Sequence, residues 1–145
     1  MKKIIALLIT SCLLLEVRAA ESAWSTDVPQ AVAKAKADGK VVLMDFTGSD
    51  WCGWCIKFKQ EALDTKEFQD YAAKNLVLVE LDYPHKIQQA AELKQANEAL
   101  AKKYKVEGFP TFVVLNKDGK EIGRQVGYKE GGAKAFIAEI EGFKK

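Results

Sequence analysis

The sequence predicts an α/β fold in which a central mixed β-sheet carries helices on both faces. Residues 40–46 and 75–83 form two continuous apolar runs, the pattern of strands that are covered on both sides. Two further strand-like stretches flank a turn at residues 117–119 and predict a β-hairpin. Helical patterns surround these strands, and the expected order is α-β-α-α-β-α-β-β-α.

The first helix is expected after a short lead that contains Trp24. Thr26 or Asp27 can cap its start, and Pro29 lies in its first turn. Gly39 ends the helix, and the first apolar strand follows directly. Its buried stripe is expected to comprise Val28, Val32 and Ala35.

The later helices are predicted from caps and from helical spacing of apolar residues. After a turn at residues 47–50, one helix is expected from about Cys52 to about Leu63, and Thr65 begins the next. The second apolar strand leads through a polar loop to a long helix with the stripe Leu93, Ala96, Leu100 and Tyr104. The stripe of the last helix is Ala133, Phe136, Ile137 and Ile140.

The N-terminus has the parts of a secretory signal peptide. Lys2 and Lys3 form a positive start, and residues 4–15 form an apolar run that is short for a membrane span. Ala19 is small enough for cleavage after it. We therefore expect residues 1–19 to be removed and residues 20–145 to form one exported domain, most simply in the periplasm. The alternative is that the run is a buried N-terminal helix.

Cys12 offers a second interpretation of the same segment. Residues 9–12 resemble a bacterial lipoprotein signal, in which Cys12 would carry the lipid and anchor the protein to a membrane. The apolar run before Cys12 is short for that purpose, and residues 13–15 would leave an apolar start to the mature chain.

The mature chain is expected to be neutral. The 145 residues are 48% hydrophobic and 29% charged, as in soluble globular proteins. Cleavage after Ala19 removes three of the 22 basic and one of the 20 acidic residues, which leaves 19 of each. A neutral chain argues against binding to nucleic acids or membrane surfaces through charge. Cleavage also leaves two cysteines, Cys52 and Cys55.

The pair Cys52 and Cys55 has three possible roles: a structural staple, half of a metal site, or a redox couple. The loop between the two cysteines is so short that a disulfide there constrains the unfolded chain little. A structural zinc site needs four ligands, and only His85 and carboxylates are left to complete one, so we expect no metal. His85 is itself interpreted as a solvated loop residue.

The position of the pair favours the redox couple. Cys52 is expected at a helix N-terminus, where free backbone N–H groups and the helix dipole favour a thiolate. Cys55 lies one turn further on the same side. A Cys52 thiolate can attack a substrate disulfide, and Cys55 can then resolve the mixed disulfide.

The stretches MDFTGSDWCGWCIKF and VEGFPTFVVLNKDGK, at residues 44–58 and 106–120, resemble the thioredoxin superfamily. The resemblance covers nearly all of the mature chain. Within the superfamily, the chain resembles bacterial proteins related to the thiol:disulfide interchange domains of the cell envelope. The resemblance implies a thioredoxin fold with an extra N-terminal helix, Cys52 as the attacking cysteine and Cys55 as the resolving one. It also implies a cis peptide bond before Pro110, with Phe109 and Thr111 flanking a substrate groove.

The resemblance also implies roles for residues around the pair. Asp45 is similar to the buried acid that moves protons to and from the resolving cysteine. The sequence departs from the family pattern in two ways. Six residues, one more than in the family, separate Asp45 from Cys52, so a bulge or a wider turn is needed. In addition, Glu80 stands where the family has a lysine near the acid. Asp45 as a mere strand-end residue is the alternative.

The two tryptophans and the residues between the cysteines are expected to contact substrates. Trp51 and Trp54 would frame the sulfurs and offer apolar surface. Gly53 and Trp54 stand where the family's intervening pair tunes the redox potential. Whether the protein is an oxidant, a reductant or an isomerase stays open at this point.

The leading hypothesis is an exported protein-disulfide oxidoreductase that reduces or exchanges disulfides through Cys52 and Cys55 and needs no cofactor beyond this dithiol. Its partners would be disulfide- or thiol-containing envelope proteins and a membrane redox donor or acceptor, and we expect a monomer. Two alternatives are a CxxC module that handles copper or zinc, or a binding protein that uses the groove without catalysis.

Overall fold

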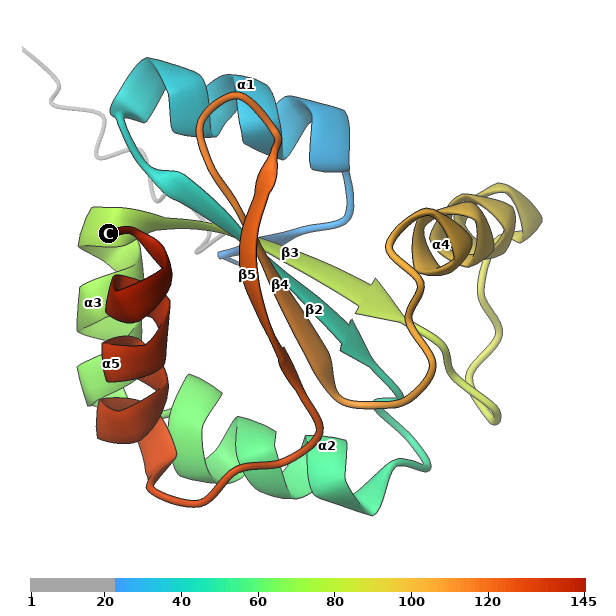
Figure 1. Cartoon of the computed structure of the whole chain (residues 1–145). Helices are drawn as coiled ribbons and strands as arrows, with labels where there is room; N and C mark the ends of the chain where they lie inside the picture. Colours follow the sequence, from blue (N-terminus) through green and yellow to red (C-terminus); the bar gives the residue numbers. More distant parts are fainter. Residues whose placement is uncertain (1–22) are drawn as a thin grey trace, which may run out of the picture.

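The computed structural model describes residues 23–145, so the expected signal peptide at residues 1–19 and the alternative lipid anchor at Cys12 lie outside the described part. The chain folds around a mixed five-stranded sheet of order β1-β3-β2-β4-β5 (Figure 1). Strands β1, β3 and β2 are parallel, and β4 and β5 run antiparallel to their neighbours. The strands are β1 Trp24–Ser25, β2 Val41–Thr47, β3 Leu76–Asp82, β4 Thr111–Leu115 and β5 Glu121–Val126.

The helices begin and end close to the positions that the sequence predicts. They are α1 Val28–Asp38, α2 Gly53–Phe58, the π-helical segment η1 Lys59–Leu63, α3 Lys66–Asn75, α4 Ala91–Lys103 and α5 Gly132–Phe143. Asp27, not Thr26, caps α1, because its side chain accepts a hydrogen bond from the N–H of Gln30. Gly39 ends the helix in the left-handed region, at φ 68°. Thr65 caps α3.

Two elements were not expected from the sequence. Trp24 and Ser25 form a short edge strand, β1, beside Leu78 and Val79 of β3. The predicted helix from Cys52 to Leu63 is divided, since α2 passes into the π-helical segment η1 at Lys59.

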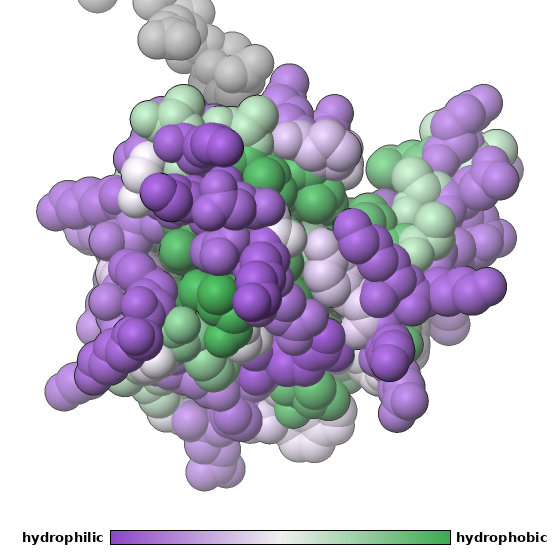
Figure 2. Space-filling model, turned by 45° about the horizontal axis from the view of Figure 1, so that its top comes forward, coloured by the Kyte–Doolittle hydropathy of each residue, from purple (hydrophilic) through white to green (hydrophobic). Residues whose placement is uncertain are grey.

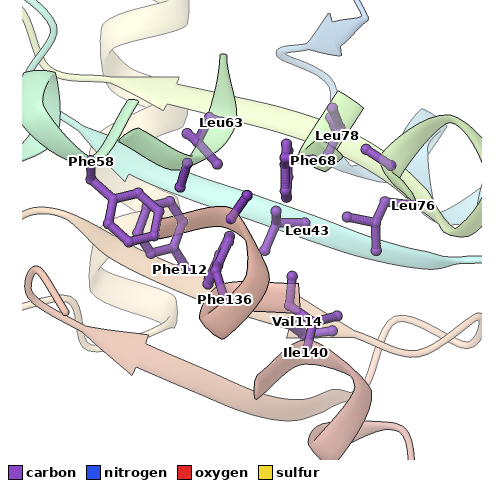
Figure 3. Packing of buried hydrophobic residues seen from close by; sticks show 13 residues of the cluster. Leu43, Phe58, Leu63, Phe68, Leu76, Leu78, Phe112, Val114, Phe136 and Ile140 are labelled. Atoms are coloured by element: carbon purple, nitrogen blue, oxygen red, sulfur yellow. The ribbon is translucent and has the colours of Figure 1, made fainter. Parts of the chain in front are cut away.

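Alternating side chains of the strands divide the core between the two faces of the sheet. On one face, α2, η1, α3 and α5 cover side chains such as Leu43 of β2 and Phe112 of β4 (Figures 1 and 3). On the other face, α1 and the end of α4 cover Val42 and Met44 of β2. The aromatic centre of the first face is formed by Phe58, Phe68, Phe112 and Phe136.

Helix α4 departs from its predicted apolar stripe. Ala96 is exposed, and Asn97 is the buried residue of this helix, at 1% exposure. The side-chain amide of Asn97 donates a hydrogen bond of 3.0 Å to the carbonyl oxygen of Asp82. Helix α4 lies beside the end of the sheet, and much of its length extends away from the sheet (Figure 1). The residue that is buried is therefore the one whose amide reaches the end of β3.

Hydrophilic side chains cover most of the surface that faces the viewer in Figure 2, with smaller apolar patches between them. Within residues 23–145, no helix has the length and apolar character needed to cross a membrane.

Candidate active site

The turn after β2 places Cys52 directly before helix α2. The backbone N–H of Cys52 donates a hydrogen bond of 2.9 Å to the carbonyl oxygen of Gly48, which closes the turn. This turn absorbs the extra residue between Asp45 and Cys52 that the sequence indicated. A Cβ atom at Gly48 would lie 2.5 Å from the indole ring of Trp51, so the close packing of the turn needs glycine there.

Cys52 and Cys55 form a disulfide, with a Cα–Cα distance of 5.2 Å. Cys52 is 7% exposed and Cys55 is 4% exposed. Cys52 is the N-terminal cap of α2, and its Sγ accepts a hydrogen bond of 3.2 Å from the backbone N–H of Cys55. Because this donor points at Cys52, a reduced Cys52 is the better placed of the two to carry negative charge.

The tryptophans beside the cysteines are the largest exposed apolar groups near the pair. Trp51 is 40% exposed and Trp54 is 58% exposed, whereas the cysteine that follows each of them is buried. Trp54 packs against the ring of Tyr128 at 5.1 Å between centroids, and the ammonium group of Lys57 lies over both rings. Together with the exposed Gly53, the tryptophans leave an apolar surface around the disulfide.

The loop before β4 approaches the same site. The peptide bond between Phe109 and Pro110 is cis. The ring of Phe109 meets that of Trp51 edge-on, with 5.8 Å between centroids, and this contact brings two distant parts of the chain together. Thr111 does not reach the surface, because its side chain is 1% exposed and its hydroxyl donates to the carbonyl oxygen of Gly108. Of the two predicted flanking residues, Phe109 alone therefore has a partly exposed side chain.

Asp45 lies beneath the disulfide, on the face of the sheet that α2 covers. It is 5% exposed and lies opposite Glu80 in the register of β2 and β3, as the sequence indicated. Burial raises the pKa of Asp45 well above its ordinary value, and the negative charges of Glu80 and Asp82 raise it further. Lys59 acts in the opposite direction.

Asp45 and Cys55 line one cavity of about 210 Å³. Asp45, Cys55, Lys59 and Glu80 all line it, with the polar side chains of Thr47, Ser49, Gln60 and Asp64. Oδ1 of Asp45 has no hydrogen-bond partner among the described residues. The arrangement places a carboxyl group that readily holds a proton in one cavity with Cys55.

The loop at residues 83–89 forms a further wall of the site, which the sequence did not reveal. The carboxylate of Asp50 accepts three backbone N–H bonds, from His85 at 2.9 Å, Lys86 at 2.6 Å and Ile87 at 2.9 Å. These hydrogen bonds hold the pKa of Asp50 below its ordinary value, and the bond from His85 has the largest effect. The only hint in the sequence was an aspartate in the turn before the cysteines. Its hydrogen-bond partners could not be predicted, because they come from a distant loop.

His85 is exposed, as expected, but it is not merely a solvated residue. Its ring stacks on that of Trp51 with 4.3 Å between centroids and 3° between planes. Trp51 also donates a hydrogen bond of 2.7 Å from Nε1 to the carbonyl oxygen of Tyr83. The loop thereby fixes the tryptophan that precedes Cys52.

The described residues hold no group of three or more histidine, cysteine, aspartate or glutamate side chains that is arranged to bind a metal ion. His85 is engaged with Trp51, and it does not join Cys52 and Cys55 in such a group.

Comparison with known proteins places the chain in a family. Residues 28–143 match the model of the thioredoxin-like domain. The disulfide bond reductase DsbH of Chlamydia pneumoniae is 38% identical over 125 residues, which cover 86% of this chain and 74% of DsbH. The thioredoxin-related protein DsbJ of the same organism is 31% identical, over 96% of this chain but 43% of its own length.

The solved structures give the same result. A structure titled DsbH oxidoreductase superposes with a TM-score of 0.77 at 35% identity, over 93% of this chain and 92% of the other. The fold, the cysteine pair at the start of α2 and these relatives agree. The chain belongs to the thioredoxin superfamily, as a thioredoxin-like protein-disulfide oxidoreductase.

Proposed function

We propose that the protein is an exported reductase of disulfides in proteins of the bacterial envelope. The observation that carries this proposal is the Cys52–Cys55 disulfide, in which Sγ of Cys52 accepts the N–H of Cys55, beside the exposed rings of Trp51 and Trp54. The similarity to a relative named disulfide bond reductase supports reduction as the direction. Residues 1–19 would direct export and residues 20–145 would form the working domain, with lipidation at Cys12 as the alternative.

In the proposed cycle, the Cys52 thiolate attacks one sulfur of a substrate disulfide. A mixed disulfide forms, and the other substrate sulfur leaves as a thiolate that takes up a proton. Cys55 then loses its proton and attacks Sγ of Cys52, which forms the Cys52–Cys55 disulfide and releases the second substrate thiol. Two electrons pass to the substrate, and a membrane donor would return two electrons to the protein.

The residues around the dithiol have separate roles in this proposal. Asp45 would accept the proton of Cys55. Phe109 and Pro110 would form one side of the substrate groove, and Trp51 and Trp54 would contact apolar side chains of unfolded or extended substrates. No cofactor other than the dithiol is proposed, and the protein would act as a monomer on its substrates.

The reduction potential tests this proposal directly. Purified protein would be equilibrated in thiol–disulfide buffers of graded potential and followed through the fluorescence of Trp51 and Trp54, which lie beside the sulfurs. We expect a value near that of thioredoxin, about −270 mV. A value toward about −120 mV, that of a strong oxidant, would contradict the reductase assignment. Absence of any reversible transition would contradict dithiol chemistry altogether.

A further inference from the structure

Asp45 is buried, so a proton that it accepts needs a path to water. The residue is 5% exposed, and its Oδ1 has no partner among the described residues. It shares a cavity of about 210 Å³ with Cys55. A water molecule occupies about 30 Å³ in the liquid, so this polar space has room for several. A proton taken from Cys55 can therefore move along the cavity, and a carboxyl group at its edge would speed the exchange of that proton with solvent.

Glu80 has the position that such a group requires. It lies opposite Asp45 in the parallel register of β2 and β3, so that both side chains point to the same face of the sheet. Neighbouring strands are about 4.8 Å apart, which keeps the two carboxyl groups within reach of one or two water molecules. Glu80 is partly exposed, unlike Asp45, and it lines the same cavity.

Lys59 provides the nearby positive charge. It is the first residue of η1, lines the cavity, and forms an ion pair with the exposed Asp64. The positive charge of its ammonium group thus offsets the negative charge of the carboxyl groups that line the cavity. The ionisable and charged groups that face Asp45 from the surrounding elements are Cys55 of α2, Lys59 of η1, Asp64 after η1, and Glu80 and Asp82 of β3.

We propose that Glu80 is a positioning residue for proton transfer, the carboxyl group that exchanges protons between Asp45 and solvent, and that Lys59 sets the charge balance of this path. The inference deepens the proposed function, since it concerns the resolving step of the same dithiol. It holds for either direction of electron flow.

The proton and electron balance of the step is complete. Cys55 gives its proton to Asp45 across the cavity and becomes the thiolate that attacks Sγ of Cys52. The Cys52–Cys55 bond forms, and the bond from Cys52 to the substrate sulfur breaks with its electron pair. Asp45 passes the proton to Glu80, Glu80 releases it to water, and the departing substrate thiolate takes a proton from solvent.

The resolving step can be measured by rapid mixing of reduced protein with saturating oxidised glutathione, followed by tryptophan fluorescence over a range of pH. We expect Glu80→Gln to slow resolution at neutral pH about tenfold, a part of the factor that acid–base catalysis supplies. A higher concentration of imidazole buffer should restore the rate in this variant, because a small base replaces the missing carrier. The native protein should not respond to the buffer.

The direction of the pH shift gives a second, independent readout. Loss of the negative charge in Glu80→Gln should move the midpoint of the pH profile down, and loss of the positive charge in Lys59→Met should move it up. Glu67→Gln and Lys74→Met, exposed changes on α3, are the matched controls and should leave the profile unchanged.

Midpoints that stay in place, or that move in the same direction, would overturn the inference, as would a slow Glu80→Gln variant that buffer does not rescue. These outcomes leave the dithiol cycle itself intact and are therefore distinct from failure of the proposed function. A protein without any dithiol transition would overturn both.

Discussion

The backbone N–H of Cys55 donates a hydrogen bond to Sγ of Cys52, so that the two sulfurs of the disulfide are not equivalent. Such a donor stabilises negative charge on the sulfur that accepts it, and Cys52 also caps the start of α2. This asymmetry supports the proposed roles, with Cys52 as the attacking and Cys55 as the resolving cysteine.

This asymmetry predicts opposite behaviour of two single-cysteine variants. Cys55→Ser should accumulate mixed disulfides with partner proteins in cells, because Cys52 attacks and nothing resolves the product. Cys52→Ser should accumulate several-fold fewer. Non-reducing gels followed by mass spectrometry would measure both. Equal trapping by the two variants would contradict the assignment of roles, and the trapped proteins would identify substrates and the redox partner.

The burial of Asp45 predicts a pH-dependent cost to stability. The pKa of Asp45 is raised in the folded protein. The contribution of Asp45 to the free energy of unfolding is therefore largest below its ordinary pKa of 3.8 and is lost as pH rises through the higher folded pKa. Asp45→Asn removes the charge, and the oxidised variant should therefore be more stable than the native protein at neutral pH. The gain should shrink as pH falls toward 4.

Urea unfolding of the oxidised proteins at several pH values would measure this gain. Asp70→Asn, an exposed change on α3, is the matched control and should show no gain at neutral pH. If Asp45→Asn were less stable than the native protein at neutral pH, the ionised carboxyl group would have to be a favourable partner in the fold, which would contradict the account of the cavity.

The aromatic core beneath α2 predicts a large loss of stability in Phe136→Ala. The ring of Phe136 lies 5.0 Å from that of Phe58 and 4.8 Å from that of Phe112, and the residue is 3% exposed (Figure 3). Truncation of such a ring costs about 3–5 kcal/mol. Phe136→Leu should cost less, because it fills more of the space. Thermal or urea unfolding would check the order, and a loss below about 1 kcal/mol for Phe136→Ala would show that the core collapses around the gap.

The sequence predicted the elements whose pattern is local and missed those that depend on distant contacts. Strands β2 and β3 are continuous apolar runs, and the hairpin of β4 and β5 has its turn at Gly119, so each is visible from composition alone. Strand β1 has two residues, too few to show a period, and exists because Trp24 and Ser25 pair with β3. The π-helical segment η1 has no signature that separates it from an ordinary helix.

The site divides in the same way. The cysteine pair follows from spacing along the chain, and the resemblance to the thioredoxin superfamily indicated that Glu80 lies near Asp45, which the register of β2 and β3 confirms. The bonds from the loop to Asp50 and the stack of His85 on Trp51 depend on how that irregular loop folds back, which no periodicity encodes. The buried position of α4 also depends on a distant contact. Asn97 is buried there instead of the predicted Ala96, because its amide donates to a carbonyl oxygen at the end of β3.

Asp50 carries the last prediction, because its carboxylate holds the loop beside the active site. Its folded pKa is lowered by the backbone N–H bonds of His85, Lys86 and Ile87, so the stability that it contributes is present above pH 3.8 and is lost as pH falls through the lower folded pKa. Asp50→Ala should therefore unfold at a lower urea concentration than the native protein at neutral pH, and the difference should shrink in acid.

Asp50→Asn tests the same bonds more gently, since its amide oxygen can still accept some of them, and it should unfold between Asp50→Ala and the native protein. Asp118→Ala, on the hairpin turn, removes an exposed carboxylate that lies 3.7 Å from Lys36 and is the matched control. In Asp50→Ala, His85 should also leave the ring of Trp51, which a change in tryptophan fluorescence would report. An unchanged fluorescence and urea midpoint would mean that the stack of His85 on Trp51, rather than the carboxylate, fixes the loop.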